Sequence, residues 1–411
     1  MMRRPAPLPL FQGRLWRLEL LLAFVQLFHL LLMSTAHFGD LVVWFFVHGI
    51  AQASLWVLRN TDREGPNFLI IPWRPLVVLF VVSLIFKLSS RAPIIGVWLA
   101  DGLRVTRDSD ELAGGSGLAS YANIFFYPVA ILLAFTALPR RVYRVLMICL
   151  FVMCAIDLIV LGTRNAPIFV LLFHLLAVPT RFGVRRVLTT LAFGIAFVAI
   201  FSYSTVNRTL EAAEGDFDWL VLFDSTTSTE VLKLNPATVE PLSRAVPAMI
   251  PAVFLEHYLS HSIAELDYLL TSPDRLKLGN ASYLIDQGCA IGMCSREKSQ
   301  DAILDANPRA GAYQTIWGSL LFDFGIVGAL LAWVLGVGAV VLFKLIRLRA
   351  SVLMVALAST VITLGMVENY LYNGLGLAQM LTIFIAYGLL RAFASVTRFD
   401  NRHGSHLRGT A

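Results

Sequence analysis

Charge is scarce in this chain. Only 15% of its 411 residues are Asp, Glu, Lys or Arg, whereas about 25% is usual in a soluble protein, and 57% are hydrophobic. The mean hydropathy is +0.71. This composition excludes an ordinary soluble domain and a disordered chain. A net charge of +6 in a membrane protein typically reflects basic cytoplasmic loops, so we expect no nucleic-acid partner.

Several chemical signatures are missing as well. Four cysteines are too few for a disulfide scaffold or a zinc-ribbon module. The sequence has no P-loop and no GxGxxG motif, so nothing indicates a nucleotide-driven pump. It has no internal repeat, which disfavours many transporter folds, and no cage of carboxylates for magnesium. We therefore expect no cofactor and no metal.

Long hydrophobic runs fill most of the chain. A helix needs about 20 mostly apolar residues to cross the hydrocarbon core of a membrane. Ten stretches qualify, which predicts an all-α polytopic membrane helix bundle. The sixth stretch is short, and Pro72 and Pro75 interrupt the third. Arg14 and Arg17 precede the first stretch as in a signal peptide, but its length favours an uncleaved span. The predicted spans are 18–36, 39–58, 68–88, 117–138, 143–162, 165–180, 187–206, 314–343, 350–367 and 375–394.

Basic residues give the bundle an orientation. If both termini are cytoplasmic, 19 lysines and arginines fall inside, and the short outside loops carry only Arg91, Arg104, Arg107 and Arg164. This asymmetry is a positive-inside signal and predicts that both termini are cytoplasmic and that the large loop lies outside. The predicted regions are a seven-span bundle at 1–206, a large periplasmic loop at 207–313, three spans at 314–395 and a cytoplasmic tail at 396–411.

The large loop contains one amphipathic segment, residues 248–270. His257, His261 and Glu265 lie at i, i+4 and i+8 and so share one helix face. Two histidines four residues apart can bind zinc, but Glu256-His257-x-x-x-His261 matches neither HExxH nor HxxEH. We interpret the segment as an interfacial helix that lies on the outer membrane surface, beside a lipid-linked substrate.

Arginines on the outer face are candidates for holding a diphosphate. Arg164 lies in the turn between spans five and six, Arg309 precedes span eight, and Arg208 and Arg275 lie in the large loop. Arginine holds diphosphate through bidentate hydrogen bonds and a permanent charge. The alternative is that these arginines snorkel to the membrane surface or form ion pairs within the loops.

Asp323 and two cysteines are the other singular residues. Asp323-Phe324-Gly325 resembles the magnesium motif of kinases, but the other kinase motifs are absent. An Asp at the outer end of a span is either functional or makes a hydrogen bond in helix packing. Cys289 and Cys294 would form a disulfide on the oxidising side of the membrane, whereas Cys149 and Cys154 lie in a span and are expected to pack inertly.

The overall plan resembles bacterial oligosaccharide repeat-unit polymerases of the O-antigen and exopolysaccharide (Wzy) type. The resemblance rests on ten spans with one large periplasmic loop, on the Gly162-Thr163-Arg164 turn, and on the segment that follows the loop. That segment reads Gly311-Ala-Tyr313-Gln-Thr-Ile-Trp-Gly318-Ser-Leu-Leu-Phe-Asp323-Phe-Gly325-Ile-Val-Gly328. The similarity covers about residues 150–390. The family's arginine motif with a glycine ten residues beyond is not matched, since Gly318 follows Arg309 too early.

The resemblance implies a GT-C-like membrane glycosyltransferase of the bacterial inner membrane, with its active face periplasmic. Such an enzyme transfers a glycan from undecaprenyl diphosphate to an incoming lipid-linked repeat unit of an O-antigen or exopolysaccharide, without a metal. Its partners would be the two lipid-linked glycans, membrane lipids and a chain-length regulator. The expected roles are diphosphate binding by Arg164, Arg208, Arg309 and Arg275, catalysis by His257, Glu256 and Asp323, and sugar binding by Tyr313 and His261.

Three other classes compete with this interpretation. An O-antigen ligase would use the same donor but transfer the glycan to a lipid A core. A flippase or other transporter of lipid-linked glycans should place charges along a path inside the bundle. A structural membrane protein would not need an arginine cluster.

The predicted topology can be tested with reporter fusions. A reporter that is active only in the periplasm should be active when fused after residue 240 and silent when fused after residue 345, because the arginine asymmetry places these positions on opposite sides. The reverse pattern would overturn the orientation and every site assigned to the outer face.

Overall fold

The computed structural model describes residues 2–3, 7–60, 71–101, 125–158, 165–177, 232–245, 250–271, 315–346, 350–367 and 379–393, together with 279, 281, 284, 285 and 289. These residues are almost entirely helical. The chain divides into two compact units, each described by itself below. One unit comprises residues 1–7, 68–187 and 378–411, and the other comprises residues 8–67 and 188–377.

The described residues form an all-α membrane protein. Four helices are long and apolar enough to cross a membrane: Leu8–Met33, Phe38–Asn60, Trp73–Gly96 and Ile316–Leu345. Shorter apolar helices are Phe126–Phe135, Pro167–Leu176, Ser351–Leu364 and Gln379–Phe393. The predicted fold class is therefore confirmed at this level. The count of ten spans stays a prediction, since span 187–206 lies outside the described residues.

The unit of residues 68–187 is built around α7, whose ten side chains are all buried. Its neighbours are α3 and α9, and α8 packs on α9. A two-residue strand at the N-terminus, β1, pairs antiparallel with β2 just before α8. The elements are β1 (Met2–Arg3), α3 (Trp73–Asp101), α7 (Phe126–Phe135), β2 (Leu138–Pro139), α8 (Arg140–Ile156) and α9 (Asn165–Leu176), followed by the helix Gln379–Phe393.

Helix α3 differs from the predicted span 68–88. It begins at Trp73 and continues to Asp101. Pro72 therefore precedes the helix and Pro75 lies in its first turn, where the missing N–H would have had no partner within the helix. The two prolines start this span and do not break it.

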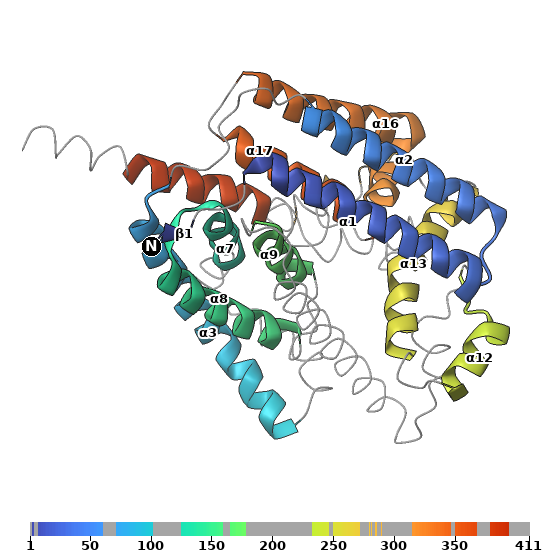
Figure 1. The fold of residues 1–411 in the computed structure, drawn as a ribbon, viewed down its shortest axis with the longest axis horizontal. Helices are drawn as coiled ribbons and strands as arrows, with labels where there is room; N and C mark the ends of the chain where they lie inside the picture. The colour runs from blue at the N-terminus through green and yellow to red at the C-terminus, as the bar shows by residue number, and fades with distance from the viewer. Residues whose placement is uncertain are drawn as a thin grey trace, which may run out of the picture. The chain divides into compact units, whose positions relative to one another are not determined.

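The other unit is a layered helix bundle. Its elements are α1 (Leu8–Phe28), η1 (His29–Met33), α2 (Phe38–Asn60), α12 (Pro236–Ala245), α13 (Ile250–Thr271), α16 (Ile316–Leu345) and α17 (Ser351–Leu364). Helix α1 runs beside α2 and also packs on α17 and α13 (Figure 1). Helix α1 begins at Leu8, ten residues before the predicted span, so Arg14 and Arg17 lie within a helix.

The large loop returns to the end of the first span. The backbone N–H of Thr35 donates to the carbonyl of Lys233 at 2.8 Å, and the N–H of Asn235 donates to the carbonyl of Met33 at 2.9 Å. Helix α12 follows directly and packs its Val239 with Val253 of α13. The parts of the loop that the structure describes are therefore integrated with the membrane helices.

Helix α16 is broken at the Asp323-Phe324-Gly325 segment. Gly325 has φ +67° and ψ −178°, a conformation that is essentially restricted to glycine. Two loop amides satisfy the carbonyls that the break leaves open. Gly279 donates to the carbonyl of Phe322 at 2.8 Å, and Ala281 donates to that of Asp323 at 3.2 Å. Non-helical backbone at membrane depth is tolerated where it is satisfied in this way.

The Gly325→Ala variant should be less stable than the wild type by about 1–3 kcal/mol, because a Cβ atom is strained at this φ and ψ. Gly336→Ala, in the regular part of the same helix, is the matched control, since its added Cβ would meet no atom within 4 Å. Thermal unfolding in detergent measures both. Equal melting temperatures for the two variants would show that the break is not held by Gly325.

Candidate functional site

A stripe of polar side chains runs along helix α1. Gln12, Glu19 and Gln26 are spaced by seven residues, and His29 follows Gln26 by three, so all four lie on one face. Gln12 is 3% exposed and the other three are 0% exposed. At 1.5 Å per residue the stripe is roughly 26 Å long, close to the thickness of a hydrocarbon core. It therefore extends along nearly a whole span.

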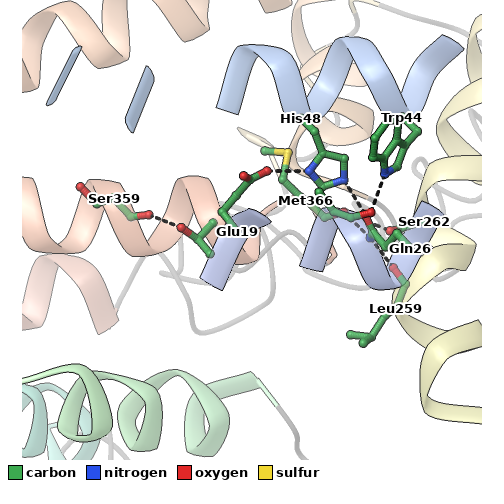
Figure 2. A network of polar contacts seen from close by, with 10 residues as sticks. Glu19, Gln26, Trp44, His48, Leu259, Ser262, Ser359 and Met366 are labelled. Carbon is green, nitrogen blue, oxygen red and sulfur yellow. Dashed lines mark hydrogen bonds and ion pairs between the residues drawn. The ribbon is translucent and has the colours of Figure 1, made fainter. Parts of the chain in front are cut away.

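The middle of the stripe is centred on His48 of α2 (Figure 2). Its Nδ1 lies 2.6 Å from Oε1 of Glu19, and its Nε2 lies 2.6 Å from Oε1 of Gln26. An amide oxygen only accepts, so His48 Nε2 carries a proton. Nδ1 then either donates to an ionised Glu19 or accepts from a protonated one. In both cases the pair has no net charge, which suits its burial.

Gln26 links three elements through its amide (Figure 2). Its Nε2 donates to the carbonyl of Leu259 in α13 at 2.6 Å and approaches the carbonyl of Met366, just after α17, at 3.4 Å. Ser262 of α13 donates to the same Met366 carbonyl at 3.3 Å. Because these acceptors are carbonyls, they also fix which end of the Gln26 amide is the oxygen.

The C-terminal end of the stripe is a histidine pair. His29 Nε2 lies 3.1 Å from His257 Nδ1, and His29 Nδ1 lies 3.9 Å from Oε2 of Glu256. The carboxylate favours a proton on His29 Nδ1, so Nε2 of a neutral His29 accepts from His257 Nδ1. A neutral His257 then carries its lone pair on Nε2. Glu256 and His29 thus make His257 Nε2 the basic atom of the cluster. We call these three side chains the histidine cluster.

A π-helical turn positions His29. Helix α1 ends at Phe28, and η1 covers His29–Met33, where the wider turn changes the direction of the side chains. Ser34 closes the turn by donating to the carbonyl of His29 at 3.2 Å. Neither this turn nor the role of His29 was expected from the sequence. The available signal was a histidine inside an apolar span, since such residues are functional candidates by default.

Helix α13 (Ile250–Thr271) confirms the predicted helix at 248–270, but its polar face is buried and not exposed as expected of an interfacial helix; its position on the membrane surface stays a prediction. His257, His261 and Glu265 are only 1%, 3% and 2% exposed, because this face packs against the membrane helices α1 and α2. His261 Nε2 lies 3.2 Å from Oε1 of Glu265. The face that looked solvated in the sequence is an inward-facing part of the bundle.

The C-terminal half of α13 approaches the start of α2 closely. A Cβ atom on Gly39 would lie 2.6 Å from the carboxylate oxygens of Asp267, so a larger residue there would displace this carboxylate. Burial raises the pKa of the Asp267 carboxyl, and His37 nearby lowers it in part. Since the folded-state pKa is raised, deprotonation of Asp267 reduces stability as the pH rises from its unfolded pKa through its folded one.

Asp323 lies buried at the break of α16. Its side chain is 3% exposed, and its Oδ1 accepts from the backbone N–H of Leu284 at 3.4 Å. Of the two alternatives open from the sequence, this contact favours the hydrogen bond in helix packing. The expected role of Asp323 in catalysis stays a prediction.

Most of the predicted ligand-binding residues cannot be placed. Cys289 is disulfide-bonded, and Cys149 and Cys154 are free. Among the described residues, no group of three or more His, Cys, Asp and Glu side chains is arranged to hold a metal. The residues that lie outside the described part of the chain are Arg164, Arg208, Arg275, Arg309, Tyr313 and Cys294.

The unit of residues 68–187 has a charged cluster of its own. Asp157, just after α8, lies 2.7 Å from Lys87 Nζ and 3.0 Å from Arg91 Nε, and it accepts from the hydroxyl of Tyr127 at 2.5 Å. We call these four side chains the Asp157 cluster. Sequence reasoning counted Arg91 only as a loop charge. The missed signal was that Lys87 and Asp157 interrupt apolar runs.

Comparisons with protein-family models, with curated proteins and with solved structures found no match to the chain. Its function is therefore inferred from its own side chains and their geometry. The polar network along α1 carries that inference.

Removal of one partner from the Glu19–His48 pair should be strongly destabilising. His48→Leu leaves Glu19 buried without its partner, which costs about 3–5 kcal/mol. The double variant Glu19→Leu/His48→Leu should regain most of this loss, because no buried charge is left over. Thermal unfolding in detergent of the two single variants and the double variant measures the coupling. Additive losses would show that the two side chains do not act as a pair.

Proposed function

We propose that the protein polymerises undecaprenyl-diphosphate-linked oligosaccharide repeat units at the periplasmic face of the inner membrane. Two observations support this function. The sequence resembles the repeat-unit polymerases, and the histidine cluster brings His29, His257 and Glu256 together at the C-terminal end of the α1 stripe, where we assign His257 Nε2 as the base. The second observation carries the proposal, because glycan transfer needs a base for the acceptor hydroxyl.

The proposed reaction is a substitution at the anomeric carbon of the donor sugar. His257 Nε2 takes the proton of the acceptor hydroxyl, and the oxygen forms a bond to that carbon. The bond from the carbon to the diphosphate oxygen breaks, and undecaprenyl diphosphate leaves with the electron pair. Glu256 stabilises the positive charge that His257 and His29 then share.

The arginines are proposed to stabilise the negative charge of the leaving group. Arg164, Arg208, Arg275 and Arg309 are proposed to hold the diphosphate, since preorganised cations stabilise charge that develops in the transition state. Tyr313 is proposed to stack on a sugar and His261 to bind one. His261 is held by Glu265, four residues on in α13, which keeps its ring oriented.

A transporter of lipid-linked glycans is the second candidate. We expected a transporter to place charges along a path inside the bundle, and the α1 stripe has this arrangement. Glu19 and His48 are buried midway along their spans, where ionisable groups commonly mark ion or proton paths. An O-antigen ligase gains no comparable support from the described residues.

The polymerase proposal is tested with purified protein and undecaprenyl-diphosphate repeat units alone. A ladder of longer lipid-linked glycans should form without nucleotide sugar or ATP, and also in chelator. His257→Gln should lower the rate by about 10²–10⁴-fold, the usual contribution of a general base. His174→Gln is the control, because His174 is also a buried histidine but contacts Tyr143 and the carbonyl of Ala130 in the other unit.

Other outcomes would separate the alternatives. Movement of intact lipid-linked units across vesicles without elongation would support the transporter. Transfer only to lipid A core would support the ligase. Equal rates for the wild type and His257→Gln, with ladder formation intact, would remove His257 as the base but leave the polymerase assignment standing.

A further inference from the structure

The Asp157 cluster places two cations around one carboxylate. Lys87 Nζ and Arg91 Nε occupy different oxygens of Asp157, and Lys87 also lies 4.9 Å from the centre of the Tyr127 ring. The Lys87 and Asp157 side chains are only 4% and 1% exposed. Within the described residues in contact here, the cluster carries one positive charge in excess. An uncompensated charge in a weakly polar interior is costly, so this arrangement favours a bound anion.

Arg91 gives the cluster an accessible edge. Its side chain is 12% exposed, which is more than Lys87 or Asp157. Asp157 engages the Nε atom, and the described residues place no partner on Nη1 or Nη2. A guanidinium with two N–H groups on one edge matches two oxygens of a phosphate or carboxylate. The cluster therefore has donors left for a further anion.

The position along α3 indicates where that anion resides. At 1.5 Å per residue, Lys87 and Arg91 lie roughly 21 Å and 27 Å from Trp73 at the start of the helix. The hydrocarbon core is about 30 Å thick, so Arg91 is close to the far boundary, where headgroup phosphates begin. The Tyr127 ring gives the cluster an aromatic wall, which is also typical of this boundary.

We propose that the Asp157 cluster is a binding site for a phosphodiester, with Arg91 as its main contact and Lys87 as the second cation. A phosphodiester carries one negative charge, which equals the excess charge of the cluster. A membrane phospholipid such as phosphatidylglycerol supplies this group at the depth of Arg91. The site does not depend on the proposed polymerase function, since it is defined by anion binding and its test needs no glycan transfer.

The test uses the full chain in dodecyl maltoside, a detergent that contains no phosphate. Titration with phosphatidylglycerol should raise the melting temperature of the wild type in a saturable manner. Oleate, an anionic lipid without phosphate, and glycerophosphoglycerol, a water-soluble phosphodiester, are titrated in parallel. Stabilisation by phosphatidylglycerol alone supports a lipid phosphodiester. Equal stabilisation by glycerophosphoglycerol supports the phosphate site with a soluble source, whereas equal stabilisation by oleate would overturn the phosphate assignment.

Three variants in the same titration separate binding from packing. Arg91→Gln should weaken the apparent affinity for phosphatidylglycerol by about tenfold or more, the usual effect of losing a charge-assisted hydrogen bond. Asp157→Asn should strengthen it, because the excess positive charge rises to two. Arg74→Gln, at the opposite end of the same helix, should leave it unchanged.

Each variant is compared with its own melting temperature in the absence of lipid. If Arg91→Gln lowers that baseline while the lipid-dependent rise stays as in the wild type, the cluster is a structural ion network only and the proposal is wrong. A weaker affinity for phosphatidylglycerol in Asp157→Asn contradicts the proposal as well. If Asp157 competes with the lipid anion, its removal strengthens lipid binding, whereas if Asp157 only holds the site together, its removal weakens it. If Arg74→Gln loses the lipid-dependent rise in melting temperature to the same extent as Arg91→Gln, the lipid binds by non-specific charge attraction and not at the Asp157 cluster.

Discussion

The fold of residues 8–67 and 188–377 depends on burial of the polar face of α1. Glu19, Gln26 and His29 are 0% exposed, so each needs a partner within the bundle. His48 supplies one from α2, Leu259 supplies a carbonyl from α13, and His257 supplies a ring nitrogen from the same helix. Hydrogen bonds of this kind have defined geometry, whereas apolar contacts alone allow helices to slide. The polar stripe therefore fixes which helices surround α1 and in which register.

This constraint also explains what could be predicted from sequence. Hydropathy predicted the four long apolar helices among the described residues, because membrane crossing is set by length and apolar content. It could not say that the face of α13 with His257 and His261 turns inward, since a polar helix face is equally typical of a helix exposed to water. The partners that decide the question, Gln26 and His29, are more than 200 residues away. The same limit applies to Asp157, whose cations come from another span.

The prolines at the start of α3 and Gly325 of α16 affect their helices differently from what the local sequence suggested. Pro72 and Pro75 looked like interruptions of a span, but a first turn tolerates both. Asp323-Phe324-Gly325 looked like part of a continuous span, but Gly325 breaks it and two loop amides complete it. In each case the backbone hydrogen bonds that the helix lacks at that position decided whether the helix begins there, continues or breaks. Single-sequence hydropathy does not report such bonds.

The contact between His29 and His257 has a consequence for how the chain is made. The two residues are 228 positions apart, and ribosomes add about 5–20 residues per second. His29 therefore waits roughly 10–50 s in the membrane before its partner is synthesised. Glu19 waits far less, because His48 is only 29 positions away. The nascent α1–α2 hairpin thus enters the bilayer with its central pair satisfied and the C-terminal end of the stripe open. That end must be kept hydrated, or held by the insertion machinery, until α13 arrives.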